Sequence, residues 1–420
     1  MKEFAKRQIQ KIMIHKRHAL YEARVASQTV PYDVWIENQL KKQEEAVAAK
    51  PSLMENAPIL AVWSYDQVDG RESFLSLLSS CATDYVLFTS DPSGLVSHGE
   101  NLAISYLSDN PGLQIGYADE TDYLKPGWSP DLLRSLFYFG NVFIIQRKLL
   151  EKVKTGISKN DYCGKVFLYD LVLCCIQETK EAQKIPLILY DNRKSGGYQE
   201  WGFEPEYDVV KDCRFLPEKL NQIETEWEDE RNGSGKVKKM VSVIIPSKDN
   251  PSVLSLCIHS LLEVTDFGDE KYKIQIIVVD NGSSLENKEK IERMQNQLKE
   301  EYSFRYEYHP MPFNFSKMCN LGASVADGDY LLFLNDDIQV VQEDWLSKML
   351  QKAARGDVGA VGAKLLYPDG ERIQHVGITS IHLGPAHKLQ FASDKENHYH
   401  RYHRSSVNVL AVTGACLMMR

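Results

Sequence analysis

The stretch YLLFLNDDIQVV, from Tyr330 to Val341, decides how the sequence is interpreted. Five mostly apolar residues run into Asn335, Asp336 and Asp337, the pattern of a strand buried on both faces and followed by a polar turn. Open α/β sheets bind their ligands at the carboxyl ends of the strands. Two adjacent carboxylates there predict a divalent metal ion with oxygen ligands that holds a diphosphate. The alternative is a solvated Asn-Asp-Asp turn, which is common between a strand and a helix.

The composition is that of a globular protein with more than one domain. The chain has 420 residues, 43% of them hydrophobic and 25% charged, which is too long for one ordinary core. A net charge of -9 argues against a general nucleic-acid binder, so no nucleic acid is expected as a partner. No apolar run has the length of a membrane span, and we expect no signal peptide. The eight cysteines form no CxxC pair, which favours reduced cysteines in a cytosolic protein.

Residues 1–50 are predicted to be a helical segment. The first 24 residues contain seven basic residues and only two acidic ones, with apolar residues between them. Such a helix could bind peripherally to the anionic inner face of the cell membrane. The alternative is a basic helix that packs on its own protein, and the short, irregular apolar stripe favours it.

Residues 51–223 alternate strand-like and helical stretches, which predicts an α/β domain. The strand-like runs are Ile59–Trp63, Tyr85–Phe88, Leu113–Tyr117, Val142–Ile145 and Ile185–Leu189. Residues 224–240 pass from an acidic block through Asn-Gly-Ser-Gly to three lysines. Glycine, serine and blocks of charge are typical of a flexible, solvated linker, so a second domain is expected over residues 241–420.

The second domain is predicted to contain a βαβαβ unit. Its first strand, VSVIIP, ends at Pro246, its second, Ile274–Val279, ends at Asp280, and Tyr330–Leu334 is the third. The helices between them are expected over Ser255–Val264, Leu285–Lys299 and, leading into the third strand, Asn320–Ala326. Right-handed crossovers make such a sheet parallel, so the three strand ends should meet at one edge, the expected ligand crevice.

The chain also contains an internal repeat. DYVLFTSDP, from Asp84 to Pro92, matches DYLLFLNDD from Asp329 to Asp337, and YFGNVFIIQR matches VTGACLMMR near residue 420. Pro92 stands where the second copy has Asp337. The first copy also has too few residues before its motif for two βα units and a third strand. We expect this copy to be degenerate, and either structural or in contact with an acceptor.

Taken together, these motifs resemble the family 2 glycosyltransferases, and in particular their tandem-domain rhamnosyltransferase-like and O-antigen-type members. In the first half, the similar segments are PYDVWIENQ and YADETDYLKPGWSPDLLRSLFYFGNVFIIQRKLL. In the second half they are VSVIIPSKDNPSVLSLCIHSLL, IIVVDNGSS, PFNFSKMCNLGASVADGDYLLFLNDDIQV, VGAVGAKLLYPDGERIQHVG and VTGACLMMR.

The resemblance implies two GT-A-like domains, the first degenerate and the second incomplete at its C-terminus. It implies a cytoplasmic enzyme that transfers a sugar, with inversion, from a UDP- or dTDP-linked donor. The acceptor would be a glycan or a lipid-linked glycan, in the synthesis of an O-antigen or rhamnan type of bacterial surface polysaccharide. A divalent metal ion, Mg²⁺ or Mn²⁺, would neutralise the leaving diphosphate.

The resemblance also assigns roles to single residues. Pro246, Ser247 and Lys248 would form the first nucleotide loop. Asp280 would bind the base or ribose, and Asn320 would lie in the segment that closes over the donor. Asn335, Asp336 and Asp337 fill the DxD-type motif, with Asp336 facing ribose or metal and Asp337 as the metal ligand. His375, in IQHVG, would lie at the donor or acceptor site.

The catalytic base is the point at which the chain departs from the family. In family members it follows the ACLMMR-like strand, but this sequence stops at Arg420, so we expect the base beyond that residue and none within the chain. Asp170 stands at the corresponding place in the first copy and is interpreted as a relic. The sequence is then either a fragment or a truncated protein, expected to bind a donor poorly and to transfer little sugar.

Two other interpretations remain open from the sequence. The chain could be a non-catalytic glycosyltransferase-like scaffold or partner protein. The histidine-rich segment, residues 382–403, could bind zinc, but no cysteine or carboxylate spacing supports a closed site, and a polar active-site loop is favoured. A sugar-nucleotide pyrophosphorylase is set aside because no Gly-rich loop with an arginine follows the first strand of the second domain.

Overall fold

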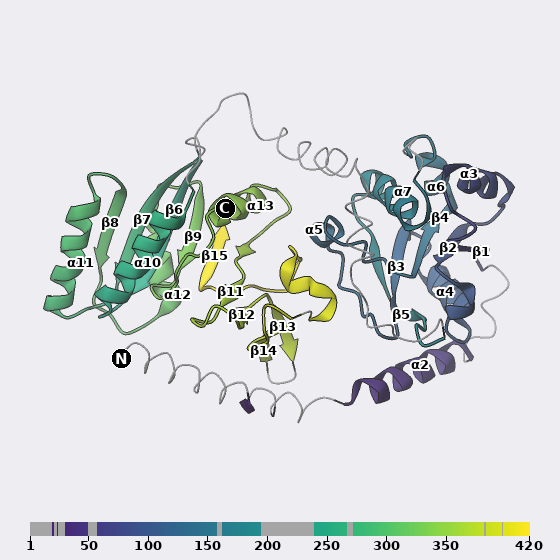
Figure 1. Cartoon of the computed structure of the whole chain (residues 1–420), viewed down its shortest axis with the longest axis horizontal. Helices are drawn as coiled ribbons and strands as arrows, with labels where there is room; N and C mark the ends of the chain where they lie inside the picture. Colours follow the sequence, from purple (N-terminus) through teal and green to yellow (C-terminus); the bar gives the residue numbers. More distant parts are fainter. Residues whose placement is uncertain are drawn as a thin grey trace. The chain divides into compact units, whose positions relative to one another are not determined.

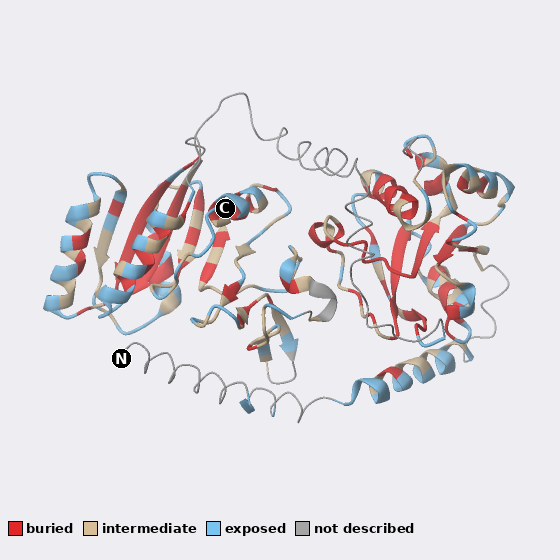
Figure 2. Ribbon diagram, in the orientation of Figure 1, coloured by how far each residue is buried: buried red, intermediate tan, exposed pale blue. Residues whose placement is uncertain are grey.

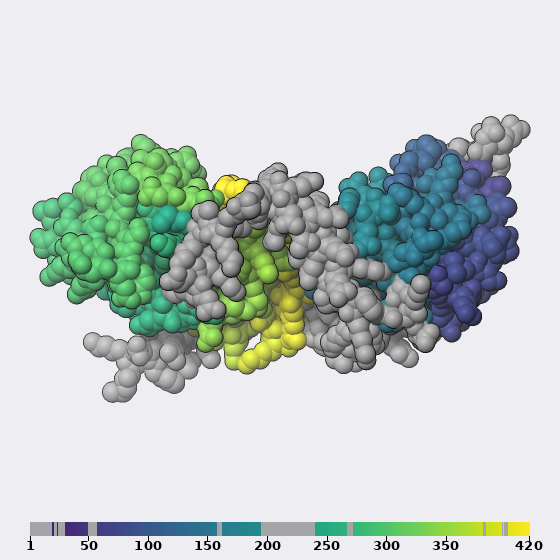
Figure 3. Space-filling view, turned by 90° about the horizontal axis from the view of Figure 1, so that it is seen from above, coloured from purple at the N-terminus to yellow at the C-terminus, as the bar shows by residue number. Residues whose placement is uncertain are grey.

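A computed structural model describes residues 19–20, 23, 30–48, 57–157, 162–194, 239–266, 272–381, 384–396 and 398–420. The chain divides into two compact units (Figure 1). The N-terminal unit is Ala19–Ile223 together with Asn397–Asn408, and the C-terminal unit is Met1–His18, Glu224–Glu396 and Val409–Arg420. In the space-filling view of Figure 3, which is coloured by residue number, the N-terminal unit is mainly purple to blue and the C-terminal unit is mainly green.

The C-terminal unit is built on a six-stranded sheet of order β10-β15-β9-β6-β7-β8, in which β6 to β9 are parallel and β15 is antiparallel to both its neighbours. The strands are β6 (Lys239–Ser247), β7 (Tyr272–Asp280), β8 (Ser303–Tyr308), β9 (Tyr330–Leu334), β10 (Val361–Gly362) and β15 (Cys416–Met419). The helices are α10 (Pro251–Val264), α11 (Leu285–Leu298), α12 (Phe315–Ser324) and α13 (Trp345–Ala353). The predicted α/β fold class with parallel strands is confirmed.

Alternation along the strands of the C-terminal unit sends side chains into two apolar clusters. Val243 and Val278 pack with α10, α11 and α13 on one face, whereas Ile244 and Val279 pack with α12 on the other. In β9, Leu332 is buried but Phe333 is only half-buried. The expectation of a third strand buried on both faces is therefore only partly met, because the single helix α12 covers the second face less completely.

The N-terminal unit has a five-stranded sheet of order β1-β2-β4-β3-β5, in which only β4 is antiparallel to its neighbours (Figure 1). Figure 2 shows that buried residues concentrate on its central strands. The strands are β1 (Leu60–Ser64), β2 (Tyr85–Thr89), β3 (Ile115–Glu120), β4 (Val142–Gln146) and β5 (Gln183–Tyr190). The helices are α2 (Tyr32–Ala48), α3 (Arg71–Ser80), α4 (Gly99–Asp109), α5 (Pro130–Leu133), α6 (Arg147–Val153) and α7 (Gly164–Thr179).

Strand pairing supports the internal repeat at equivalent residues. In the N-terminal unit Thr89 pairs with Val142, and in the C-terminal unit Leu334 pairs with Cys416. The next residue makes the same bond in both copies: the Ser90 amide donates to the Asn141 carbonyl at 3.1 Å, and the Asn335 amide to the Ala415 carbonyl at 2.9 Å. The N-terminal unit passes from β1 through α3 directly to β2, so it has no counterparts of β7, α11, β8 and α12 there.

Several element boundaries differ from the sequence-based expectation, those of α12 and β6 among them. The helix before β9 is Phe315–Ser324, not Asn320–Ala326, because the Asn314 side chain caps it by accepting the Lys317 amide at 2.9 Å. Strand β6 begins at Lys239, inside the predicted linker. The rest of that linker and residues 1–18 of the predicted N-terminal helical segment lie outside the described residues. No described helix has the length and apolar character needed to cross a membrane.

The histidine-rich segment is not a single loop. His387 ends β14 (Gly384–His387), which pairs with β13 (Ile378–Ile381), and a 3-10 helix spans Tyr399–Arg404. The part from Asn397 to Asn408 groups with the N-terminal unit: the Tyr402 and Tyr123 hydroxyls lie 2.9 Å apart, and the Asn408 amide donates to Ser129 Oγ at 3.1 Å. His382 lies outside the described residues.

Candidate functional site

The carboxyl ends of β6, β7 and β9 lie beside one another in the C-terminal unit. Strand register places Ser247 opposite Asp280 across β6 and β7, while Ile244 pairs with Phe333 across β6 and β9. The Ser247 hydroxyl donates to Asp336 Oδ2 at 2.7 Å. The first nucleotide loop and the acidic motif, which are far apart in the sequence, therefore touch at this edge.

The two carboxylates of the acidic motif lie in different surroundings. Asp337 is exposed, whereas Asp336 is half-buried. Burial raises the pKa of Asp336, and the neighbouring charge of Asp337 raises it further, against the bond from Ser247. A bound cation would relieve both effects. Among the described residues, no three His, Cys, Asp or Glu side chains gather around one point. One or two carboxylates completed by substrate phosphates are nevertheless the ligand set that Mg²⁺ commonly takes, so the residues fit such an ion.

Asp280 is fully buried at the end of β7. Its Oδ1 accepts the backbone amides of Gly282 and Ser283 at 2.9 and 2.8 Å, and its Oδ2 accepts the Tyr306 hydroxyl at 2.6 Å. Burial and the bond to Asp280 raise the pKa of Tyr306, so its proton stays in place. In this structure the Asp280 carboxylate is closed to solvent, and a nucleoside would have to displace the Tyr306 hydroxyl to reach it.

A second hydrogen-bond network joins the loop after β6 to the loop after β7. Asp249 has a left-handed backbone, with φ 54°. Its amide donates to Ser283 Oγ at 2.7 Å, and its Oδ1 accepts the Ser284 amide, also at 2.7 Å. Pro246 and Ser247 are buried, while Lys248 is exposed between them and Asp249. The loop is thus held on both sides of the Lys248 side chain. Sequence reasoning did not single out Asp249 or Tyr306.

The remaining predicted site residues are placed as follows. Asn320 is exposed on α12, and Asn335 is half-buried after β9. His375, at the end of β12 (Ile373–His375), is 1% exposed. Its Nδ1 lies 2.8 Å from Nδ1 of His387, and its Nε2 accepts the Thr413 amide at 3.3 Å. The structure therefore brings together Ser247 and Asp336, and separately His375 and His387.

The corresponding edge of the N-terminal unit carries different chemistry. Asp91 Oδ1 accepts the Ser93 amide at 2.8 Å, so its side chain closes a turn. Glu120, at the end of β3, is fully buried and pairs with the equally buried Lys125 at 2.8 Å. Burial opposes the charge on Glu120, but Lys125 and the bond from the Asn141 amide outweigh it and lower the pKa of the carboxyl. This edge is filled by an internal ion pair that sequence reasoning missed.

Several further groups complete that buried network. Asn141 Nδ2 and Asn192 Nδ2 both donate to Glu120 Oε2, at 2.9 and 3.0 Å. Gly140 has φ +65°, and a Cβ there would overlap Glu120 Oε1, so glycine is required for both the backbone and the space. Asp170, the residue at the place of a catalytic base, is 1% exposed within α7. It lies in the interior, where an acceptor hydroxyl could not reach it.

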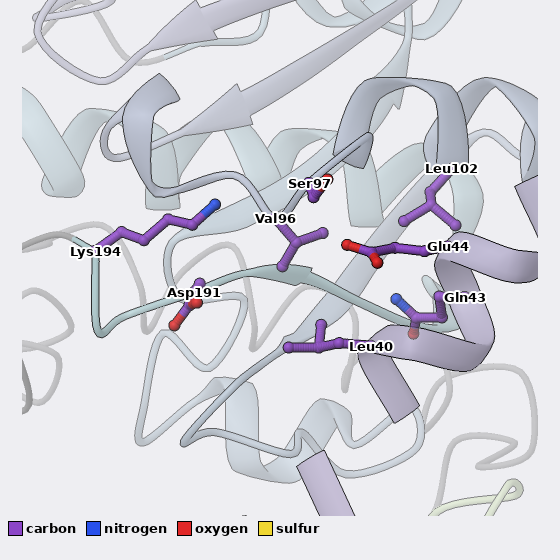
Figure 4. Close-up of a pocket in the computed structure, with 8 residues that line it drawn as sticks. All are labelled: Leu40, Gln43, Glu44, Val96, Ser97, Leu102, Asp191 and Lys194. Atoms are coloured by element: carbon purple, nitrogen blue, oxygen red, sulfur yellow. The ribbon is translucent and has the colours of Figure 1, made fainter. Parts of the chain in front are cut away.

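A small cavity in the N-terminal unit contains none of the predicted site residues (Figure 4). Its volume is about 140 Å³, and it is lined by Leu40, Gln43, Glu44, Val96, Ser97, Leu102, Asp191 and Lys194. Several of its polar groups are already engaged. The Gln43 amide bonds both backbone groups of Ile188, at 3.0 and 2.9 Å, and Lys194 Nζ donates to the Leu95 carbonyl at 2.9 Å. This cavity therefore lies where α2 packs against residues 96–102 and 191–194 of the same unit.

Comparison with known proteins identifies relatives of both halves of the chain. Residues 242–420 match the model of glycosyl transferase family 2. Uncharacterized protein y4gI of Sinorhizobium fredii is 30% identical over 362 residues, 79% of this chain and 37% of that protein. O-antigen biosynthesis protein RfbC of Myxococcus xanthus is 29% identical over 371 residues, 81% of this chain and 28% of that protein. The chain thus spans about a third of the length of these curated relatives.

Two solved structures share partial similarity with this chain. The mannosyltransferase PcManGT from Pyrobaculum calidifontis, in complex with GDP-Man and Mn²⁺, is 17% identical with a TM-score of 0.28, over 36% of this chain and 44% of that one. TarS 1-349 of S. aureus in complex with UDP-GlcNAc is 16% identical with a TM-score of 0.24, over 30% and 34% of the two chains.

Proposed function

We propose that the C-terminal unit, whose residues 242–420 match the model of glycosyl transferase family 2, has a GT-A-type site that transfers a sugar from a nucleotide-sugar donor to a glycan acceptor. The contact between Ser247 and Asp336 is the observation that carries the proposal. It joins the loop expected to hold the nucleotide to the carboxylates expected to hold the diphosphate. That contact lies at the sheet edge where α/β proteins bind ligands.

The donor side of the proposed site uses the residues predicted from the sequence. Lys248 is exposed on a loop held by Asp249, and a cation there would face a nucleoside diphosphate. Asp280 would take the base or ribose once the Tyr306 hydroxyl has moved. Asp337, assisted by Asp336, would bind Mg²⁺ or Mn²⁺. Such an ion supplies positive charge that neutralises the diphosphate as it leaves, a contribution of several kcal/mol to such reactions.

The acceptor side of the proposal is more general. We propose an inverting displacement at the anomeric carbon by a hydroxyl of a glycan or lipid-linked glycan. The name of the relative RfbC, an O-antigen biosynthesis protein, supports a role in O-antigen synthesis. We extend the proposal to bacterial surface polysaccharide of the O-antigen or rhamnan type. The seven cysteines among the described residues are free, which supports a reducing, cytoplasmic location. The proposal assigns the catalytic base to no residue described in this chain.

The test is a binding panel that does not depend on turnover. UDP, dTDP and GDP are titrated into the full chain by calorimetry, with Mn²⁺ and again with EDTA. We expect one nucleoside diphosphate to bind, and only in the presence of the metal ion. The second candidate function, a non-catalytic scaffold, is favoured by the closed state of Asp280. It predicts that none of the three binds under either condition, which would overturn the proposed function.

Pro92→Asp should not give the N-terminal unit a nucleotide site, although it restores the aspartate that the second copy has at that position. Between β1 and β2, where every residue is described, the unit has no strand equivalent to β7 and hence no residue equivalent to Asp280. The measurement uses the double variant Pro92→Asp/Asp337→Ala, with Pro92→Ala/Asp337→Ala as control. Both should lack Mn²⁺-dependent calorimetric heat, and binding by the first alone would show that the N-terminal unit is not degenerate.

A further inference from the structure

We propose that His375 is a positioning residue whose unprotonated Nε2 holds the segment 413–415 beside the acidic motif, and that its partner His387 fixes this tautomer. The proposal concerns how the sheet edge is kept in place, and its role in transfer rests on the proposed function. His375 touches neither the acidic motif nor the nucleotide loop in any described contact. It acts through the backbone of the chain that leads into β15.

The tautomer of His375 follows from its donors. The amides of Thr413 and Gly377 both point at His375 Nε2, each at 3.3 Å. A backbone N–H can only donate, so Nε2 must carry a lone pair and the single ring proton must be on Nδ1. His375 is 1% exposed, so water does not compete for this nitrogen. The ring is therefore a fixed acceptor for the backbone.

The second ring then has a defined tautomer as well. His375 Nδ1 and His387 Nδ1 lie 2.8 Å apart, and the rings meet edge to face at 87°. Since His375 Nδ1 carries the proton, His387 Nδ1 accepts it, and the proton of neutral His387 is on Nε2. The hydrogen bond thus runs from β12 to β14, with His375 Nδ1 as the donor and His387 Nδ1 as the acceptor.

A chain of bonds connects this pair to the acidic motif. The Thr413 amide is held by His375, Thr413 Oγ1 accepts the Ala415 amide at 3.4 Å, and the Ala415 carbonyl accepts the Asn335 amide at 2.9 Å. Asn335 is followed directly by Asp336. The support continues into β15, where Cys416 pairs with Leu334. His375 thereby fixes the backbone on which the acidic motif rests.

The other donor to His375 is also rigidly placed. Gly377 has φ +110°, a backbone conformation that side chains disfavour. A Cβ at this position would lie 2.8 Å from Cγ1 of Val409, so there is no room for one. The turn that presents the Gly377 amide and the segment that presents the Thr413 amide are thus packed against each other around one nitrogen.

Proton uptake by the pair must break one of these bonds. A second proton on His387 would place two N–H groups face to face, and a proton on His375 Nε2 would displace the Thr413 amide. The elements around His375 are β11 (Leu365–Leu366), β13, β14 and residues 409–413, and among their described residues only His387 is titratable. Charged residues next to these elements in the sequence include Lys388, and Lys364, which pairs with Asp394 at 2.8 Å. Among the described residues, no anion contributes to the pKa shifts of the two rings in favour of the charged form.

The expected pH range follows from the direction of the shifts. Burial, and then the neighbouring His387, lower the pKa of His375 to about 4, and burial also lowers the pKa of His387. A group whose pKa is lowered in the folded state favours folding above its unfolded value, about 6.5 for histidine. That contribution is lost as the pH falls from about 6.5 toward 4. We therefore expect the 413–415 segment to loosen as the pH approaches 4, where His375 takes up its proton.

The decisive measurement reads the tautomers directly. Correlation spectra of ¹⁵N-histidine-labelled full chain at about pH 7.5 should show the proton of His375 on Nδ1 and that of His387 on Nε2. Each is assigned from His375→Gln and His387→Gln samples. A proton on Nε2 of His375 would overturn the proposal. This result does not depend on nucleotide binding, so it can fail while the proposed function stands, and the reverse.

Hydrogen exchange tests the support that His375 gives to the backbone. In His375→Phe the bulk remains but the acceptor is lost, so a peptide covering residues 411–418 should lose protection about tenfold at pH ~7.5, the effect of one hydrogen bond. The wild type should approach that state as the pH falls to about 4, after correction for intrinsic exchange. His259→Gln, an exposed histidine bonded only within α10, is the control. Equal protection of wild type and His375→Phe at both pH values would overturn the proposal.

Discussion

Asp337→Asn should weaken Mn²⁺-dependent binding of a nucleoside diphosphate to the full chain by about 100-fold, or ~3 kcal/mol. The side chain is exposed and keeps its shape in the variant, so folding should be unaffected. What is lost is the negative charge that holds the metal ion. Asp336 cannot replace it fully, because one of its oxygens is engaged by Ser247 and burial raises the pKa of its carboxyl.

A matched control comes from the other end of the same strand. Asp329 precedes β9, is exposed and accepts the Met240 amide at 2.9 Å. Asp329→Asn makes the same chemical change at the amino end, away from the expected diphosphate. Calorimetry with and without EDTA should show wild-type binding for this variant. If Asp337→Asn and Asp329→Asn bind equally, the assignment of Asp337 to the metal ion is wrong.

The sequence was sufficient to predict the strands and the edge that they share. Apolar runs that end in polar residues predicted the positions of β6, β7 and β9, and the internal repeat predicted that β2 is the equivalent of β9. These signals are local, since each lies within one short run of the chain. The boundary of α12 was missed because one capping side chain, Asn314, decided it and no periodic pattern marks that position.

The side-chain partners could not be predicted in the same way. Tyr306 and Asp280 are 26 residues apart, and His375 and His387 are 12 apart. Each pairing depends on which strands become neighbours and on which face each side chain emerges. Asp280 was expected to contact a ligand, and its bond to Tyr306 is visible only in three dimensions. Sequence therefore predicts where polar groups gather more readily than what each of them holds.

The buried ion pair of the N-terminal unit is the second place where a large effect is expected. Glu120→Gln should lower the free energy of unfolding of this unit by about 3–5 kcal/mol, because it leaves the Lys125 ammonium buried without its counter-charge. Lys125 Nζ would keep its bond to the Phe139 carbonyl, at 2.5 Å, and its place 5.6 Å from the centre of the Tyr123 ring, and neither of these partners carries a negative charge. Urea unfolding followed by hydrogen exchange of β3 and β4 measures the loss in the unit concerned.

The control for Glu120→Gln is an exposed pair in the same unit, Lys152 with Glu178. Glu178→Gln should change stability by less than about 1 kcal/mol, because solvent screens that pair. The double variant Glu120→Gln/Lys125→Met should be more stable than Glu120→Gln alone, since it removes the stranded charge. Losses of similar size for Glu120→Gln and Glu178→Gln would show that burial does not govern the pair.

The outcome also bears on the relation between the two copies. At one edge of the N-terminal sheet, a closed network is formed by Glu120, Lys125, Asn141 and Asn192. The corresponding edge of the C-terminal sheet presents Asp336 and Asp337 instead. A network whose members satisfy one another offers no free charge to a diphosphate. Glu120→Gln should therefore destabilise the N-terminal unit and leave nucleoside diphosphate binding unchanged at a concentration of urea where both units remain folded. Loss of that binding would mean that the N-terminal edge takes part in the nucleotide site. The N-terminal edge could then no longer be assigned a purely structural role and the C-terminal edge the whole of ligand binding.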